Sequence, residues 1–166
     1  MGSSLKKLPL SCLAVGVALA VAVPSALAIA NPPTEPEYVE TVEPICKRNA
    51  DANSRILTGV KQQVQKGQLV SAGKRFIRAS SALGKAVTQI AAVPKPTEDA
   101  VKLTKWIGLL KQQKTGLLKV GQALKTEDKP GAQKAANSLK RANNEANATV
   151  ISIPFKECRI EASRFL

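Results

Sequence analysis

The cysteines are the residues of this chain whose chemistry is most readily predicted. There are three of them, Cys12, Cys46 and Cys158. Cys12 lies within an apolar N-terminal leader, whereas Cys46 and Cys158 lie near opposite ends of the remaining chain. A pair of thiols in an exported protein typically forms a disulfide. We therefore predict a Cys46–Cys158 disulfide that closes nearly the whole domain.

Catalytic and metal-binding residue patterns are absent from the sequence. Histidine does not occur at all, which removes the commonest general base and a common zinc ligand. The adjacent acids Glu98-Asp99 and Glu127-Asp128 lie at expected helix ends, where consecutive side chains do not face each other. Lys114 falls on an expected buried stripe, either as a nucleophile of lowered pKa or as a side chain that reaches water. We expect no enzyme, no metal and no cofactor, with an atypical enzyme using Lys or Glu as the weakest alternative.

The N-terminal residues have the pattern of a secretory signal. Lys6 and Lys7 precede an uncharged apolar run of 14 residues (10–23), and Pro24 and small residues follow. This pattern predicts a signal peptide over residues 1–28. The alternative is an uncleaved N-terminal membrane anchor, which is disfavoured because the run is shorter than the ~20 residues that span a bilayer. We expect an extracytoplasmic protein, either secreted or associated with the cell envelope.

The rest of the chain divides into a linker and a helical domain. Residues 29–43 are rich in Pro and Glu, which predicts a flexible linker. Residues 44–166 form the expected domain. Apolar residues at three- and four-residue steps predict helices, with Gly and Pro between them. The expected helices cover residues 42–66, 69–92, 97–125 and 128–153.

Expected caps and close contacts complete this helical prediction. Gly67 is placed to end the first helix, while Thr97 and Asp128 are suitable N-caps for the third and fourth. Gly73 and Ser80 on the apolar stripe of the second helix allow a neighbour to approach closely. Short connections favour an all-α, antiparallel up-down-up-down four-helix bundle. In that topology Cys46 and Cys158 lie at the same end, which agrees with the predicted disulfide.

Positive charge is the strongest indication of function. The formal net charge is +13, and a basic surface attracts polyanions. We expect an acidic cell-wall polymer or an anionic membrane surface as partner, and no nucleic acid, since exposed aromatics and known motifs are missing. The alternatives are a merely solvated surface or an interaction scaffold with an apolar patch near the fourth helix. The candidate anion-binding residues are Lys74, Arg75, Arg78, Lys102, Lys105, Lys111, Lys140 and Arg141.

The two ends of the expected domain also resemble known sequences. Residues 44–57 (PICKRNADANSRIL) and 157–165 (ECRIEASRF) are similar to the ends of a group of small exported bacterial helical proteins. That resemblance implies the cysteine pair and no assigned activity. It leaves the ligand and the oligomeric state open.

Overall fold

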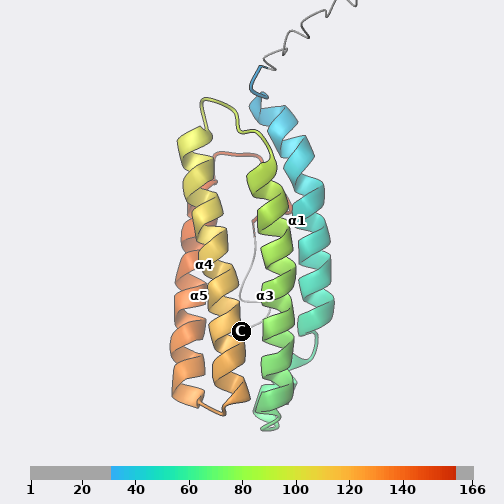
Figure 1. The fold of residues 1–166 in the computed structure, drawn as a ribbon, viewed down its shortest axis with the longest axis vertical. Helices are drawn as coiled ribbons and strands as arrows, with labels where there is room; N and C mark the ends of the chain where they lie inside the picture. The colour runs from blue at the N-terminus through green and yellow to red at the C-terminus, as the bar shows by residue number, and fades with distance from the viewer. Residues whose placement is uncertain (1–30, 160–166) are drawn as a thin grey trace, which may run out of the picture. The chain divides into compact units, whose positions relative to one another are not determined.

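Helices dominate the computed structural model of this chain, which describes residues 31–159. The four long helices lie side by side, and the short α2 lies at the end where α1 connects to α3 (Figure 1). The described residues contain no strand, so the all-α prediction is confirmed for them. The helices in chain order are α1 (Glu35–Leu57), α2 (Val60–Gln65), α3 (Leu69–Ala92), α4 (Ala100–Lys125) and α5 (Lys129–Thr149).

The N-terminal predictions concern residues that the structure does not describe. Both the signal peptide over residues 1–28 and its alternative, a membrane anchor, lie outside residues 31–159. Within the described range, no helix is both long enough and apolar enough to cross a bilayer.

The predicted linker is wrong over most of its length, because α1 begins at Glu35. The backbone N–H and the hydroxyl of Thr34 both donate to the Glu37 carboxylate at 2.8 Å, and these bonds lower the pKa of Glu37. Pro36 occupies the first turn, where its missing N–H has no helical acceptor to lose. Tyr38 is fully buried and extends the apolar stripe of α1 by two turns.

The expected helix over residues 42–66 is interrupted. α1 ends at Leu57, and Gly59 adopts a left-handed conformation with φ 77° before α2 begins. A side chain at this φ would be strained, whereas glycine adopts it readily. Gly67 also has a positive φ, 74°, and it ends the short helix as expected. α2 is therefore a separate short helix that precedes α3.

The later helix boundaries follow the sequence closely. α3 coincides with the predicted range. α4 begins two residues after the predicted Glu98, because its N-cap is Asp99 rather than Thr97. The Asp128 side chain accepts a hydrogen bond from Gly131 N at 2.9 Å, which confirms the predicted cap of α5. α5 ends at Thr149 rather than near Ile153.

Small residues bring α3 and α4 together. A Cβ on Gly73 would lie only 2.5 Å from the Gly121 carbonyl oxygen. The Ser80 hydroxyl donates to the Lys114 carbonyl at 2.9 Å. The close approach expected at Gly73 and Ser80 is therefore confirmed. Besides this pair, α4 packs closely on α5 and α1 on α3, whereas α1 and α5 form no comparably close pair.

The C-terminal segment, residues 150–159, crosses from the end of α5 toward α1 (Figure 1), where Cys158 meets Cys46. Phe155 is fully buried. Its ring stacks on Trp106 of α4 with a centroid distance of 5.1 Å and lies 6.4 Å from the ring of Tyr38 of α1. An irregular segment thus replaces direct contact between α1 and α5, and we call this the closed end.

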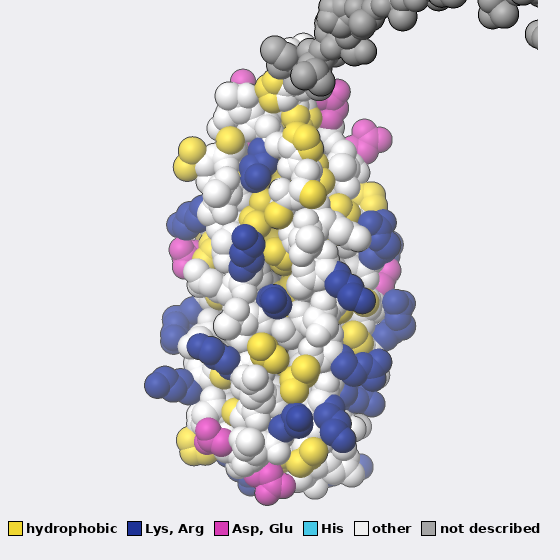
Figure 2. Space-filling model, in the orientation of Figure 1, with side chains coloured by type: hydrophobic (Ala, Val, Ile, Leu, Met, Phe, Trp, Pro, Cys, Tyr) yellow, Lys and Arg dark blue, Asp and Glu magenta, His cyan; other side chains and the backbone are white. Residues whose placement is uncertain are grey.

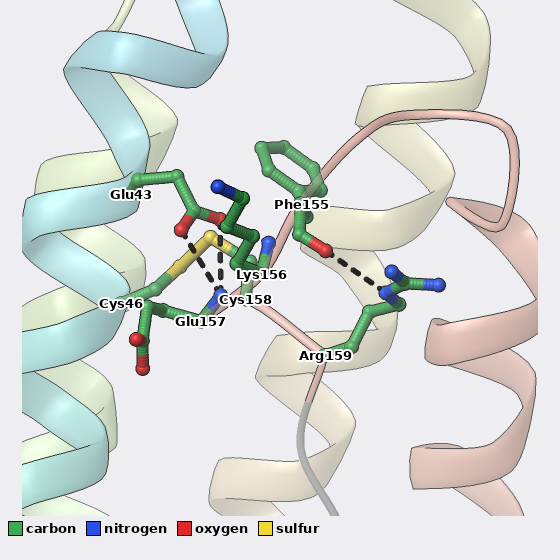
Figure 3. The surroundings of a disulfide bond; sticks show 7 residues. All are labelled: Glu43, Cys46, Phe155, Lys156, Glu157, Cys158 and Arg159. Atoms are coloured by element: carbon green, nitrogen blue, oxygen red, sulfur yellow. Dashed lines mark hydrogen bonds between the residues drawn. A yellow bond between two sulfur atoms is a disulfide. The ribbon is translucent and has the colours of Figure 1, made fainter.

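The closed end is joined covalently. The sulfur atoms of Cys46 and Cys158 lie 2.06 Å apart, with a Cα–Cα distance of 4.9 Å. Beside them, the Glu43 carboxylate accepts hydrogen bonds from the backbone N–H groups of Lys156 at 2.9 Å and Glu157 at 3.0 Å (Figure 3). The cysteine pair predicted from the sequence is therefore in disulfide geometry, supported by a second, polar contact between the same two segments.

Candidate anion-binding grooves

A basic groove runs between α4 and α5. Its volume is 540 Å³, and its walls include Lys111 and Lys119 from α4 and Lys134 from α5, with no Asp or Glu in the lining. Residues four and eight apart share one face of a helix, so Lys111 and Lys119 both face the groove. The floor is shallow because the helices are close: a Cβ on Gly116 would lie 3.1 Å from Leu139 Cβ. We call this the α4/α5 groove.

The hydroxyls of Thr115 and Ser138 add hydrogen-bonding groups to the same groove. Thr115 lies midway between the two α4 lysines in sequence, and its hydroxyl donates to the Lys111 carbonyl at 3.0 Å. Ser138 accepts a hydrogen bond from the Arg141 guanidinium at 3.1 Å, which brings a further cation beside the groove. The hydroxyl protons are already donated to backbone carbonyls, so the ammonium groups around this shallow floor are the donors that suit the oxygens of phosphate or carboxylate groups.

A second basic groove, the α1/α3 groove, lies between α1 and α3. Its volume is 460 Å³, and Arg48, Arg78 and Lys85 line it, again with no Asp or Glu. Arg78 and Lys85 are seven residues apart and therefore lie on one face of α3. Asn49 of α1 contributes a buried polar side chain to this groove. Two neighbouring helix pairs thus each present three cations around a shallow concave surface.

The groove cations are not used in ion pairs within residues 31–159. The ion pairs there join Lys47 to Asp51, Lys102 to Asp99 and Lys105 to Glu145, at N–O distances of 3.1, 2.8 and 3.2 Å. None of these residues lines the α4/α5 groove or the α1/α3 groove. The groove ammonium and guanidinium groups are therefore available to an external anion.

The predicted anion-binding residues separate into engaged and available groups. Lys102 is bound to Asp99 and also donates to the Ser152 hydroxyl at 3.0 Å, and Lys105 is paired with Glu145. Arg75 donates to the Thr58 carbonyl. These cations stabilise contacts between segments of the chain, so they are less available to a ligand than the groove cations.

The remaining predicted residues fall in different places. Arg78 lines the α1/α3 groove and Lys111 the α4/α5 groove. Lys74 and Lys140 are exposed and line neither groove, and Arg141 lies beside the α4/α5 groove through Ser138. The structure therefore does not bring the eight residues together into one site.

Sequence reasoning missed four groove cations: Arg48, Lys85, Lys119 and Lys134. The spacing of Lys111 and Lys119, and of Arg78 and Lys85, was a usable signal for a shared helix face. The partners across each groove had no such signal, because their positions depend on how two helices are aligned along their length.

Basic side chains also occur widely outside the grooves. Figure 2 shows Lys and Arg side chains spread over one face and along both edges rather than gathered in a single patch. Concave lining and lack of pairing, more than positive charge alone, therefore distinguish the groove cations.

Other kinds of site find little support in the described residues. No group of three or more Cys, Asp or Glu side chains there could hold a metal ion. Lys114 is exposed, so its side chain reaches water as the more ordinary interpretation expected. Trp106 is fully buried in the core and offers no ring face to a ligand at the surface. Comparisons with protein-family models, curated proteins and solved structures found no match to this chain.

Proposed function

We propose that this chain is an exported, non-enzymatic cell-envelope protein that binds polyanions through the α4/α5 groove, with the α1/α3 groove as a second site. The ligands would be acidic cell-wall polymers or anionic lipid head groups. Both present repeated phosphate or carboxylate groups, and repeated charges favour binding to several fixed cations at once.

One observation supports this proposal above the others: Lys111, Lys119 and Lys134 line one concave surface with no carboxylate among its lining residues. A basic residue that merely solvates the protein has no reason to gather with others in a groove, because like charges repel. An anion bound among the three would relieve that repulsion. The second groove, around Arg48, Arg78 and Lys85, has the same property.

The proposed scaffold for these grooves is an antiparallel up-down-up-down four-helix bundle closed by the disulfide. Its support is the pairing of early residues in one helix with late residues in the next. Gly73 near the start of α3 approaches Gly121 near the end of α4. Lys105 near the start of α4 pairs with Glu145 near the end of α5. A rigid bundle of this kind fixes the spacing of cations that lie on different helices.

The test compares two triple variants that lose the same charge. In the groove variant, Lys111, Lys119 and Lys134 are changed to Gln. In the control variant, Lys66, Lys74 and Lys140 are changed to Gln. These three control lysines are exposed and line neither basic groove. Each surface ion pair is worth ~0.2–1 kcal/mol, so the groove variant should bind polyphosphate at low salt roughly tenfold more weakly. The control variant should lose far less.

Separate binding experiments distinguish the two ligand sources. Vesicles containing phosphatidylglycerol, vesicles of phosphatidylcholine alone, and soluble polyphosphate are each titrated into the protein. Binding to the phosphatidylglycerol vesicles but not to polyphosphate indicates that the ligand is an anionic lipid surface. Binding to both indicates that the grooves accept any polymer or surface with repeated phosphate groups. Equal losses in both variants, or no binding to any anion, would contradict the proposal.

An interaction scaffold is the second candidate. Its support is an exposed apolar pair, Val101 at 86% and Ile151 at 69% exposure. The contact between Lys102 and Ser152 brings the two segments that contain this pair together. The scaffold function predicts a defined oligomer or partner complex that Val101→Asp and Ile151→Asp disrupt. A strictly monomeric wild-type protein whose behaviour does not change on substitution would remove the self-association form of this candidate.

A further inference from the structure

Among the described residues, the C-terminal segment lies between α1 and α5 at the closed end, whereas the other end presents a groove. There, a groove of 490 Å³ lies between α2 and α5, with a floor from α3 and α4. We call it the α2/α5 groove. Gly59 separates α2 from α1 with its left-handed conformation, and α2 supplies one wall of the groove. The volume is in the range of ~300–1,000 Å³ that small-molecule sites occupy.

The lining of the α2/α5 groove is apolar at its base and cationic at its rim. Phe76, Val120 and Leu124 form the floor, and Val64 of α2 forms part of one wall with 39% of its surface exposed. Lys61 of α2 and Lys129 of α5 also line the groove, and no Asp or Glu does. Neither lysine takes part in an ion pair within residues 31–159.

We propose that the α2/α5 groove binds a single-chain anionic amphiphile, with its acyl chain on the apolar floor and its head group between Lys61 and Lys129. Burial of the chain would remove apolar surface from water on both partners. The two unpaired lysines would supply complementary charge to a carboxylate or phosphate. This site is separate from the two basic grooves and does not depend on the proposed polyanion function.

The direct test is calorimetric titration of the purified protein with decanoate, laurate and myristate, below the concentrations at which they form micelles. Each buried methylene is worth ~0.8 kcal/mol, so adding two should tighten binding roughly tenfold until the groove is full. The methyl ester of laurate should bind more weakly than laurate, because it has no charge for the lysines. Affinity that does not depend on chain length, or an ester that binds equally well, overturns the proposal.

Matched variants locate the site. Val64→Asp should abolish laurate binding, whereas Val70→Asp, at a position of similar exposure (40%) outside this lining, should not. Lys61→Gln with Lys129→Gln should weaken binding, and Lys66→Gln with Lys140→Gln should leave it nearly unchanged. Circular dichroism checks that each variant is folded. If both members of a pair lose binding equally, the amphiphile does not occupy this groove.

Two other occupants would also overturn the proposal. If laurate binds only after Phe165→Asp and Leu166→Asp are introduced, the groove belongs to the chain's own C-terminus. If the wild-type protein forms a dimer that Val64→Asp dissociates and laurate does not bind, the groove belongs to a second copy. Polyphosphate binding, measured in parallel, should be unaffected by Val64→Asp, so this proposal and the polyanion function can fail separately.

Discussion

The two ends of the space between α1 and α5 differ in what covers the core there. We call the end that holds the α2/α5 groove the open end. At the closed end, Phe155 of the C-terminal segment covers Trp106, and the Cys46–Cys158 disulfide joins that segment to α1. At the open end, the floor around Phe76 and Leu124 is bordered by α2 and α5 but is left as a groove. One end is therefore held by covalent and aromatic contacts, whereas the other presents an apolar groove among the described residues.

The largest expected effect is at the closed end. Phe155 is fully buried and contacts rings from two helices, and such a residue replaced by Ala typically costs ~3–5 kcal/mol. Phe155→Ala should therefore lower the free energy of unfolding by about that amount in a denaturant titration. Laurate affinity, measured under conditions where the variant is folded, should remain unchanged. A loss below about 1 kcal/mol would show that the C-terminal segment does not stabilise the core.

Removal of the disulfide should have a similar or slightly smaller effect. The disulfide closes a loop with a sequence separation of 112, and loss of a native disulfide typically costs ~2–5 kcal/mol. Cys46→Ser with Cys158→Ser should lower the free energy of unfolding in that range. Reductant should destabilise the wild-type protein to the same extent and leave the double variant unchanged. A wild-type protein insensitive to reductant would contradict a structural disulfide.

A smaller effect is expected at the open end. Asp128 caps α5 through Gly131 N, and loss of such a cap typically costs ~1 kcal/mol. Asp128→Ala should lower the free energy of unfolding by about this amount, and hydrogen exchange should increase in the first turn of α5. Exchange that increases equally at the closed end would indicate that the two ends are not energetically distinct.

The smallest expected effect at neutral pH concerns Tyr38, whose buried hydroxyl has no hydrogen-bond partner in the described residues. Burial raises its pKa from 10.0 to about 12. Above pH 10 the unfolded chain ionises first, so this residue reduces stability between about pH 10 and 12 and has no such effect at lower pH. Tyr38→Phe should be neutral or slightly stabilising at pH 7 and should reduce the alkaline loss.

Ultraviolet absorbance gives a direct check, because Tyr38 is the only tyrosine. The tyrosinate signal should appear near pH 12 while the protein is folded. A midpoint near pH 10 in folded protein would mean that water reaches the Tyr38 hydroxyl and that the side chain is not buried.

Sequence patterns predicted most of the helices, but not the start of α1 or the path of the C-terminal segment. The stripe of α3 and the Asp128 cap depend on neighbouring residues, and both were predicted correctly. The N-terminus of α1 departs from the prediction, because Pro and Glu are typical of a linker but form the first turn of a helix here. Thr34, three residues before Glu37, with Pro36 between them, was a readable capping signal.

The grooves could be predicted only in part for a physical reason. Same-face spacing places Lys111 and Lys119 on one face of α4, but the position of Lys134 opposite them depends on how α5 is aligned along α4. That alignment follows from packing contacts such as the one between Gly116 and Leu139, which no local pattern encodes. The stacking of Phe155 on Trp106 could not be predicted either, because the two residues are far apart in sequence.

The most direct test of the central claim is the salt dependence of polyphosphate binding by the wild-type protein and by the Lys111→Gln, Lys119→Gln, Lys134→Gln variant. Binding that neutralises fixed cations releases counterions, so the logarithm of the affinity falls with the logarithm of the salt concentration. The slope for the variant should be shallower than that of the wild type by roughly two to three. Equal slopes would show that the α4/α5 groove does not contact the polyanion and would contradict the account.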